Sequence, residues 1–478
     1  MKMGALGLLD STVMAVASTA PAYSLTATLY LLIGAVGLAS PAAILVSFLP
    51  VLSIALAYSY MNRSNPNCGA SYAWLTQAVS PWAGWFTGWV QTAASVLFLV
   101  QAPSVAGQNT LGFLSSTGLL PASASSNALA VALVGITWLA LTTAMVVYGI
   151  QIASRFQWVL LTIEYVVVVV FALTALIVVA TQHPRGSRPF SWSWLNPFAM
   201  PGIDGLAAGT VLAVFIFWGW DTAANVSEET RNARTAPGQA GVIAMFILLF
   251  IYLLASIAIQ EYLPANQIVS AQSDGLRYFA SRLAAGPWGS IMLLAVLSST
   301  VATVQTTLLP AARVTLAMAR DGVWPRFFTI VHPRFKTPWI GTLVLAGAAA
   351  VGLLLTTLAS NPAATLINLV AGIGILIAFY YGVTGLACAW YYRRLLLRDA
   401  KTFLLAGVMP LVGGVFLLWV GYEVFVQTLQ QSGWAAVLPC FSALLLGFPF
   451  TIAAWWANHG YFALRAGSAD RDTLLSAS

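Results

Sequence analysis

Long apolar stretches separated by short polar segments dominate the chain. Most are close to the roughly 20 residues that an α-helix needs to cross the hydrocarbon core of a membrane. Only helices and closed barrels satisfy all their backbone groups in lipid, so stretches of this length predict transmembrane helices. We predict twelve spans, at residues 13–37, 41–61, 82–106, 128–149, 157–181, 205–227, 238–260, 288–312, 338–358, 364–391, 402–427 and 434–457.

The composition agrees with a polytopic membrane protein. Only 7% of the 478 residues are charged and 60% are hydrophobic, whereas a typical globular chain has roughly 25% charged residues. The mean hydropathy of +0.86 excludes an ordinary soluble enzyme, a disordered protein and a fibrous protein. We therefore expect an all-α protein whose first partner is the lipid bilayer.

The basic residues lie on one side of the predicted spans. With the N-terminus inside, sixteen of the 20 Lys and Arg residues fall in inner segments. The other four are Arg185, Arg188, Arg277 and Arg282. This bias predicts a multi-pass protein of the cell membrane with both termini cytoplasmic. Because the charge follows the membrane, it does not indicate a nucleic-acid partner.

The sequence has no pattern typical of catalysis or of a cofactor. Cys68, Cys388 and Cys440 are too far apart for a zinc-ligand spacing or a disulfide framework, and the three histidines are scattered. A nucleophile elbow and a phosphate-binding loop are both absent. We therefore predict no enzyme activity, no catalytic residue, no metal and no cofactor.

Two predicted spans contain helix breaks in corresponding positions. The first has Pro21 in mid-membrane among small and hydroxyl residues, and the sixth has Gly219 between two tryptophans, followed by Asp221. If the first ten spans are two repeats of five, these are the first spans of the two repeats, and the repeats have opposite orientations. Interrupted helices in such a pair indicate a transporter site near the bilayer midplane.

A few charged residues fall within the predicted spans, and each is a functional hypothesis because a charge there is costly. Glu164 lies near mid-depth in the fifth span, where it is suited to bind and release a proton or to pair with a cation. Asp221 borders the sixth-span break; it attracts a substrate ammonium, serves as a second proton site or satisfies freed backbone amides. Glu423, in the eleventh span, is interpreted as structural, and Arg313 lies near the cytoplasmic half of the eighth.

Four stretches resemble the amino acid–polyamine–organocation transporter family. They are residues 65–74, which run from Asn65 to Trp74, residues 219–232, residues 312–325 and residues 332–338. The third contains the ordered run Ala-Met-Ala-Arg-Asp-Gly-Val-Trp-Pro and is the most specific of the four. Together they extend across nearly the whole chain.

The resemblance implies a fold of twelve helices with a five-plus-five inverted repeat, broken helices 1 and 6 and alternating access. The implied units are residues 1–180 and 181–400 for the two repeats, 401–457 for two further helices and 458–478 for a cytoplasmic tail. In this family the broken helices surround the substrate. The implied substrate-binding residues are Ser18, Thr19, Ala20, Pro21, Ala22, Tyr23, Phe215, Phe217, Trp218, Gly219 and Asp221.

Two departures from the family pattern leave the chemistry of the substrate and of the ion open. Family amino acid carriers usually have glycines in the first break, where this chain has none, so an amine without an α-carboxylate stays an alternative. Many proton-coupled members have a lysine at the position of Glu164. The coupling residues are predicted to be Glu164 and Asp221, with H⁺ or Na⁺ as the ion. For Na⁺, the ligands would include hydroxyl groups of Ser298, Ser299, Thr300 and Thr303.

The sequence therefore predicts a secondary active transporter that imports an amino acid or related amine, with proton coupling as the first hypothesis. The alternatives are a polyamine or amine carrier, a substrate exchanger, a Na⁺-coupled symporter and a nutrient sensor that does not transport. The oligomeric state stays open. Short helices near the membrane surface are expected within Asn65–Val79 and Ser270–Ala285.

Overall fold

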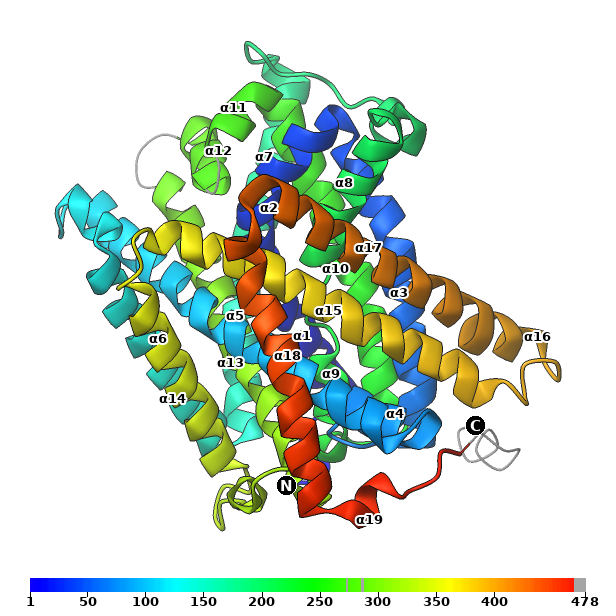
Figure 1. Cartoon of the computed structure of the whole chain (residues 1–478). Coiled ribbons are helices and arrows are strands. Elements are labelled where there is room, and N and C mark those ends of the chain that lie inside the picture. The colour runs from blue at the N-terminus through cyan, green and yellow to red at the C-terminus, as the bar shows by residue number, and fades with distance from the viewer. Residues whose placement is uncertain (272–273, 285–287, 468–478) are drawn as a thin grey trace.

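The computed structural model describes residues 1–271, 274–284 and 288–467, and helices form most of this part of the chain (Figure 1). Within those residues the extended pairing is confined to one isolated parallel β-bridge, between Leu6 and Thr230. The prediction of an all-α protein is confirmed.

The helices vary in length from single turns to 36 residues. The helices of the first half are α1 (Leu8–Thr19), α2 (Pro21–Val36), α3 (Ser40–Ser64), α4 (Ser71–Ala78), α5 (Pro81–Ser116), α6 (Ala128–Tyr148), α7 (Ile150–Gln182), α8 (Gly202–Ile216) and α9 (Thr222–Asn225). Those of the second half are α10 (Ala236–Tyr262), α11 (Ala265–Ala271), α12 (Gly275–Leu283), α13 (Trp288–Arg320), α14 (Trp339–Thr356), α15 (Pro362–Tyr392), α16 (Ala400–Thr402), α17 (Met409–Ser432), α18 (Trp434–Ala457) and α19 (His459–Phe462). Single 3₁₀ turns connect several of these helices, and a π-helical turn, η8 (Phe403–Val408), leads into α17.

Ten helical segments of the described chain are long and apolar enough to cross a membrane. The prediction of twelve spans differs from this number at two places. The segment Leu8–Ser64 has 57 residues and contains both the first and the second predicted span. The sixth predicted span is interrupted, and its first half, α8, has only 15 residues. The twelve-span arrangement and the inverted repeat therefore stay predictions.

Local sequence signals explain where several helices begin. Proline is the first residue of α2, α5 and α15. At this position the N–H of any residue has no partner within the helix, so proline loses nothing by lacking one. Ser80 caps α5 by accepting a hydrogen bond from the backbone N–H of Ala83 at 3.2 Å. Asn127 caps α6 in the same way. These starts are encoded within a few residues, so the sequence predicts them to within a residue or two for α5, α6 and α15.

Other helix bounds differ from the prediction, and α7 begins at Ile150 rather than at residue 157, the predicted start of the fifth span. The third and eighth spans were expected to end at residues 106 and 312, but α5 continues to Ser116 and α13 to Arg320. A helix does not stop where the apolar pattern stops, because its backbone hydrogen bonds continue until the chain breaks them. Short helices lie in both expected surface segments: α4 within Asn65–Val79, and α12 within Ser270–Ala285, of which residues 272, 273 and 285 lie outside the described ones.

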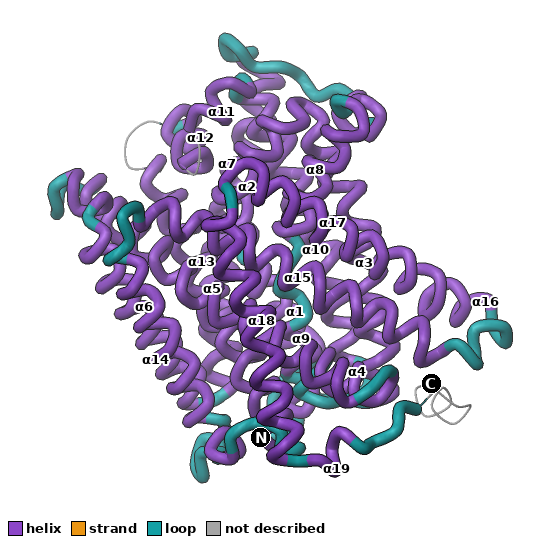
Figure 2. The backbone as a smooth tube through the Cα atoms, viewed as in Figure 1, coloured by secondary structure: helices purple, strands orange, loops and turns teal. Residues whose placement is uncertain are grey.

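The N-terminus and α19 lie at one end of the bundle, and α11 and α12 lie at the other (Figure 1). Near the centre, α1 packs against α7, α10 and α13, and α5 packs along α13. Loops gather at the two ends, but Figure 2 shows non-helical backbone inside the bundle beside α1 and α9. Irregular backbone at membrane depth is tolerated only where it is buried in protein or lines a cavity, so this region is the candidate site.

Candidate transport site

The first span is broken at Ala20, as the sequence predicts. α1 ends at Thr19 and α2 begins at Pro21, and Ala20 between them has left-handed dihedral angles of φ 48° and ψ 67°. A side chain in this region of dihedral space costs roughly 1–2 kcal/mol. The break also frees carbonyl groups at the end of α1, and Thr303 of α13 donates its hydroxyl to one of them, Ser18 O, at 2.7 Å.

Two backbone amides at the start of α2 are bound by side chains of other helices. The N–H of Ala22 donates to Oε1 of Glu164 at 2.7 Å, and the N–H of Tyr23 donates to Oγ of Ser299 at 3.2 Å. Ser299 donates its own hydroxyl to the same Glu164 oxygen at 2.9 Å. Glu164 therefore joins α7, α13 and the broken first span at one point.

The second oxygen of Glu164, Oε2, is buried and has no hydrogen-bond partner among the described residues. The whole side chain is 0% exposed. Helix N-termini attract anions because their N–H groups are unpaired and the helix dipole is positive there. At α2 the protein's own carboxylate occupies this position.

The sixth span is broken at Gly219, also as predicted. α8 ends at Ile216 and the short α9 begins at Thr222. Gly219 has φ 118°, and a Cβ atom added there would lie 2.6 Å from the carbonyl oxygen of Ser18. Only glycine allows this approach, so the two breaks touch through backbone. The hydroxyls of Ser18 and Thr222 also lie 2.9 Å apart.

A small cavity of about 10 Å³ lies between the two breaks. A cavity of roughly 10–15 Å³ holds about one water molecule, so a solute larger than water requires the lining side chains to move apart. Trp218 meets Phe98 of α5 edge-on, with ring centroids 5.0 Å apart. The lining residues are Ser18, Thr19, Ala20, Tyr23, Ser24, Phe98, Phe215, Trp218 and Thr303.

Several of the predicted substrate-binding residues lie away from this cavity. Those that line it are Ser18, Thr19, Ala20, Tyr23, Phe215 and Trp218, and those that do not are Pro21, Ala22, Phe217, Gly219 and Asp221. Phe217 is fully buried and packs against Tyr252, with ring centroids 5.3 Å apart. In a helix, adjacent residues point about 100° apart, so neighbours in sequence face different surroundings.

Asp221 is buried and both its oxygens are hydrogen-bonded. Tyr381 donates its hydroxyl to Oδ1 at 2.8 Å, and Tyr380 donates to Oδ2 at 3.2 Å. Both tyrosines belong to α15. Three roles were left open for Asp221. Its hydrogen bonds to α15 suggest a fourth, in which Asp221 holds the sixth-span break against that helix.

The sequence prediction missed Phe98 and Ser24 and gave Thr303 a different role. Phe98 lies in a uniformly apolar run of the third span, which contains no signal that separates it from its neighbours. Among the span-eight hydroxyls proposed as Na⁺ ligands, only Ser299 contacts Glu164. Ser298 and Thr300 bond to carbonyl groups of their own helix.

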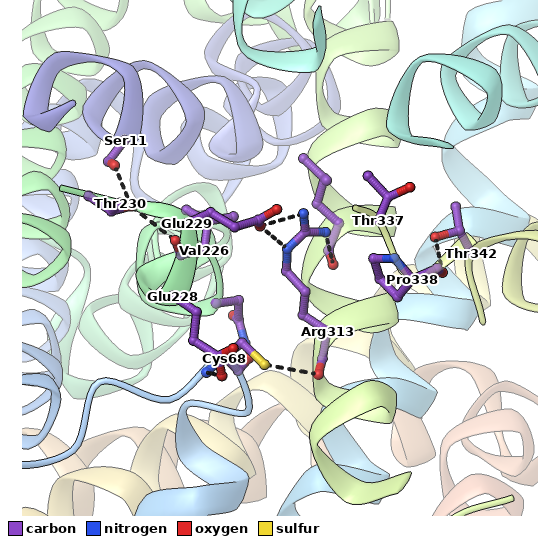
Figure 3. Close-up of polar contacts among 12 residues, drawn as sticks. Ser11, Cys68, Val226, Glu228, Glu229, Thr230, Arg313, Thr337, Pro338 and Thr342 are labelled. Atoms are coloured by element: carbon purple, nitrogen blue, oxygen red, sulfur yellow. Dashed lines mark hydrogen bonds and ion pairs between the residues drawn. The ribbon is translucent and has the colours of Figure 1, made fainter. Parts of the chain in front are cut away.

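At the end of the bundle that carries the N-terminus, two ion pairs join α13 to the segment after α9, and Figure 3 shows the buried one, between Arg313 and Glu229. Arg313 donates through Nε to Glu229 at 2.7 Å, and both side chains are 0% exposed. About two turns further along α13, Arg320 pairs with Glu228 at 2.9 Å. Burial raises the pKa of Glu228, but hydrogen bonds from Arg320 and Cys68 outweigh it and leave the pKa below its ordinary value.

The N-terminal residues are attached to the same segment. Leu6 is 1% exposed, accepts a backbone hydrogen bond from Arg231 at 2.8 Å and donates one to Glu229 at 3.0 Å. The hydroxyls of Ser11 and Thr230 lie 3.2 Å apart, as Figure 3 shows. The start of the first span, the end of the sixth and the eighth are therefore tied together at this end of the protein.

The family model for amino acid permeases matches residues 6–447 of this chain. The chain belongs to the amino acid permease family. This match covers both helix breaks, the cavity and the ion pairs, and it confirms the resemblance inferred from the four sequence stretches. The protein is a multi-pass membrane transporter and not an enzyme.

Proteins that are similar to the chain have names that state different substrates. The low-affinity putrescine importer PlaP of Escherichia coli (strain K12) is 26% identical over 413 residues, which are 83% of this chain and 84% of that protein. The methylthioribose transporter of Bacillus subtilis (strain 168) is 31% identical over 216 residues, 44% of this chain and 43% of that protein. Asc-type amino acid transporter 1 of Mus musculus is 26% identical over 369 residues, 76% of this chain and 66% of that protein.

Proposed function

We propose that this permease imports an amino acid or a related amine across the cytoplasmic membrane, coupled to protons, by alternating access. The observation that carries the proposal is the position of Glu164 at the junction of α7, α13 and the first-span break. Proton coupling needs a group whose protonation changes contacts between moving elements. A carboxyl group bound to the amide of Ala22 is suited to do this, because a change of its charge changes the strength of that contact.

Proton binding at Glu164 is supported by its contacts, which include no basic side chain among the described residues. Among the described residues, its polar contacts are the amide of Ala22 and the hydroxyl of Ser299, while Oε2 has none. A bound proton would neutralise the buried carboxylate without other help. Na⁺ would need several oxygen ligands, and of the four span-eight hydroxyl groups considered for it only that of Ser299 is hydrogen-bonded to Glu164. We therefore place H⁺ ahead of Na⁺ as the coupling ion.

The substrate would lie in the cavity between the two breaks. Phe98, Phe215 and Trp218 offer apolar and aromatic surface, while Ser18 and Thr303 provide polar groups. A small solute with one apolar part and one or two polar groups matches this lining. An ammonium group has carbonyl oxygens of the broken helices as its natural acceptors.

A second candidate, an amine without an α-carboxylate, is favoured by one specific observation. The amides of Ala22 and Tyr23, which would bind a substrate carboxylate, already donate to Glu164 and Ser299. A substrate carboxylate would have to displace one of these acceptors. A diamine would not, and the similarity to a putrescine importer agrees with this alternative.

The inverted repeat and the membrane orientation are part of the same proposal. Residues 1–180 and 181–400 would be the two repeats, 401–457 two additional helices and 458–478 a cytoplasmic tail. The distribution of basic residues supports cytoplasmic termini. The ion pairs of Arg313 and Arg320 would then lie on the cytoplasmic side and close the route from the cavity to the cytoplasm.

Uptake into proteoliposomes tests the proposal. The panel comprises neutral, cationic and acidic amino acids, putrescine, ethanolamine and methylthioribose, each measured with an inward proton gradient, with an inward Na⁺ gradient and with neither. We expect accumulation of an amino acid or amine with the proton gradient alone. Accumulation that requires Na⁺ would refute proton coupling, and uptake only in exchange for internal substrate would make the protein an exchanger. Accumulation of diamines without amino acids would establish the second candidate.

A further inference from the structure

The indole group of Trp218, which lines the cavity, is hydrogen-bonded to a residue that does not line it. Its Nε1–H donates to the hydroxyl oxygen of Tyr380 at 2.7 Å. The hydroxyl of Tyr380 in turn donates a hydrogen bond to Oδ2 of Asp221 at 3.2 Å. All three side chains are buried, and Tyr380 is only 1% exposed. A cavity-lining side chain is thus connected through one tyrosine to a carboxylate that does not line the cavity.

The direction of this chain of hydrogen bonds is determined by its two ends. An indole N–H can only donate and an ionised carboxylate can only accept. The Tyr380 hydroxyl between them must therefore accept from Trp218 and donate to Asp221. The Tyr380 hydroxyl therefore serves both the indole N–H of Trp218 and a carboxylate oxygen of Asp221. A phenylalanine at this position would leave each of them without this partner.

The neighbouring Tyr381 is bonded to the same carboxylate, and its hydrogen bonds among the described residues do not include one to Trp218. Its hydroxyl donates to Asp221 at 2.8 Å and accepts from the backbone N–H of Gly219 at 3.5 Å. It is also 1% exposed. Tyr380 and Tyr381 thus form a natural pair for comparison: both bind Asp221, both lie on α15, and only Tyr380 holds the indole.

The orientation of the indole determines the shape of the cavity. Trp218 packs edge-on against Phe98 with an interplanar angle of 77°. Phe98 in turn packs edge-on against Tyr23, with ring centroids 6.2 Å apart. Edge-on contacts of this kind depend on ring orientation. An indole free to turn about its side-chain bonds would lose this contact and would widen the space beside Phe98.

We propose that Tyr380 is a positioning residue that fixes the indole of Trp218 through its hydroxyl and thereby sets the size of substrate that the cavity accepts. This inference rests on the proposed function, because it assumes that the cavity binds the transported solute. It names a residue outside the cavity as a determinant of specificity, acting through Trp218.

The test compares Tyr380→Phe with the matched control Tyr381→Phe in the uptake assay. The readout is the ratio of kcat/KM between two substrates that differ in size, alanine and leucine or putrescine and cadaverine. We expect Tyr380→Phe to shift this ratio about tenfold toward the larger substrate, the order of effect that a change of a methylene or two in pocket size has. Tyr381→Phe is expected to change both substrates by the same factor and to leave the ratio within about twofold.

A second pair of variants separates positioning from a general loss of structure. Trp218→Phe removes the N–H that Tyr380 binds, so it should favour the larger substrate by itself. Adding Tyr380→Phe to Trp218→Phe should then leave the ratio unchanged. If the ratio shifts again in the double variant, or if Tyr380→Phe and Tyr381→Phe have equal effects on it, Tyr380 does not act through Trp218 and the proposal is wrong.

The assay also distinguishes failure of this inference from failure of the proposed function. Wild-type protein that transports members of the panel, with size selectivity unaffected by Tyr380→Phe, overturns only the role of Tyr380. Wild-type protein that transports none of them overturns the proposed function, and the inference with it. Folding of each variant is checked by its thermal unfolding in detergent. If Tyr380→Phe does not fold, the result for Trp218→Phe decides, and an unchanged ratio there refutes the proposal.

Discussion

Two carboxylates, Glu164 and Glu229, are completely buried in this protein, and their surroundings are opposite. Glu229 forms an ion pair with Arg313, which is itself 0% exposed. The partners of Glu164 among the described residues are an amide and a hydroxyl. Each of the two carboxylates has one oxygen without a hydrogen-bond partner among those residues, so the contrast lies in the cation. A paired charge suits a permanent contact, because protonation of Glu229 would leave the buried Arg313 without its counter-charge. A carboxyl group without a cationic partner can gain and lose a proton without leaving another charge unpaired. The difference separates a structural group from a candidate for coupling.

The largest effect on this comparison is expected from breaking the paired side. Arg313→Met leaves Glu229 buried without a cation, which typically costs about 3–5 kcal/mol of folding stability. We expect a strong decrease in the thermal unfolding temperature in detergent and in the yield of folded protein. Adding Glu229→Leu should recover much of the loss, since two apolar residues replace a complete pair. A single variant that unfolds at the wild-type temperature would contradict the assignment of a structural ion pair.

The unpaired side should respond in transport rather than in stability. Glu164→Gln keeps the shape of the side chain but cannot exchange a proton. We predict that it abolishes accumulation driven by a proton gradient and spares exchange of substrate across the membrane. Glu423→Gln is the matched control, because Glu423 lies within α17, far along the chain from both breaks. We expect this variant to accumulate substrate as the wild type does. Accumulation that still depends on pH in Glu164→Gln would remove this residue from coupling.

A smaller change at Glu164 sharpens the comparison further. Ser299→Ala removes one hydrogen-bond donor to Glu164 and the acceptor for the N–H of Tyr23. Each of these two buried hydrogen bonds is worth about 1 kcal/mol, so we expect the folded protein to survive with gradient-driven uptake altered in its pH dependence. Ser298→Ala, whose hydroxyl bonds only to Ala295 O in its own helix, is the control. Equal pH profiles for the two variants would show that Ser299 does not influence Glu164.

The smallest effect is expected at the exposed ion pair on α13. The side chains of Arg320 and Glu228 are 40% and 26% exposed. Such pairs contribute about 0–1 kcal/mol because water screens them. We predict that Arg320→Met changes the unfolding temperature far less than Arg313→Met. Similar losses for the two variants would mean that burial does not explain the difference between the pairs.

Much of the candidate site could be predicted from residues close together in sequence. Pro21 and Gly219 marked the two breaks, because a missing N–H and a missing Cβ have the same local consequence in any membrane helix. Glu164 was recognised because a carboxylate in an apolar span is costly wherever it points. Phe98 was not recognised, since one phenylalanine in an apolar run looks the same whether it faces lipid, a neighbouring helix or a cavity.

The sequence by itself determined that this protein is a multi-pass helical transporter, because apolar length, the lack of charge and the family motifs are properties of short segments. Only the tertiary structure decided which of those segments meet. It brought Glu164 to the amides of α2, joined Gly219 to Ser18 and placed Tyr380 between Trp218 and Asp221. These contacts join residues that are 142 to 201 positions apart in the sequence. The helices that carry these residues are held together by many weak interactions at once. Their geometry follows from the packing of the whole bundle, and no local pattern in the chain encodes it.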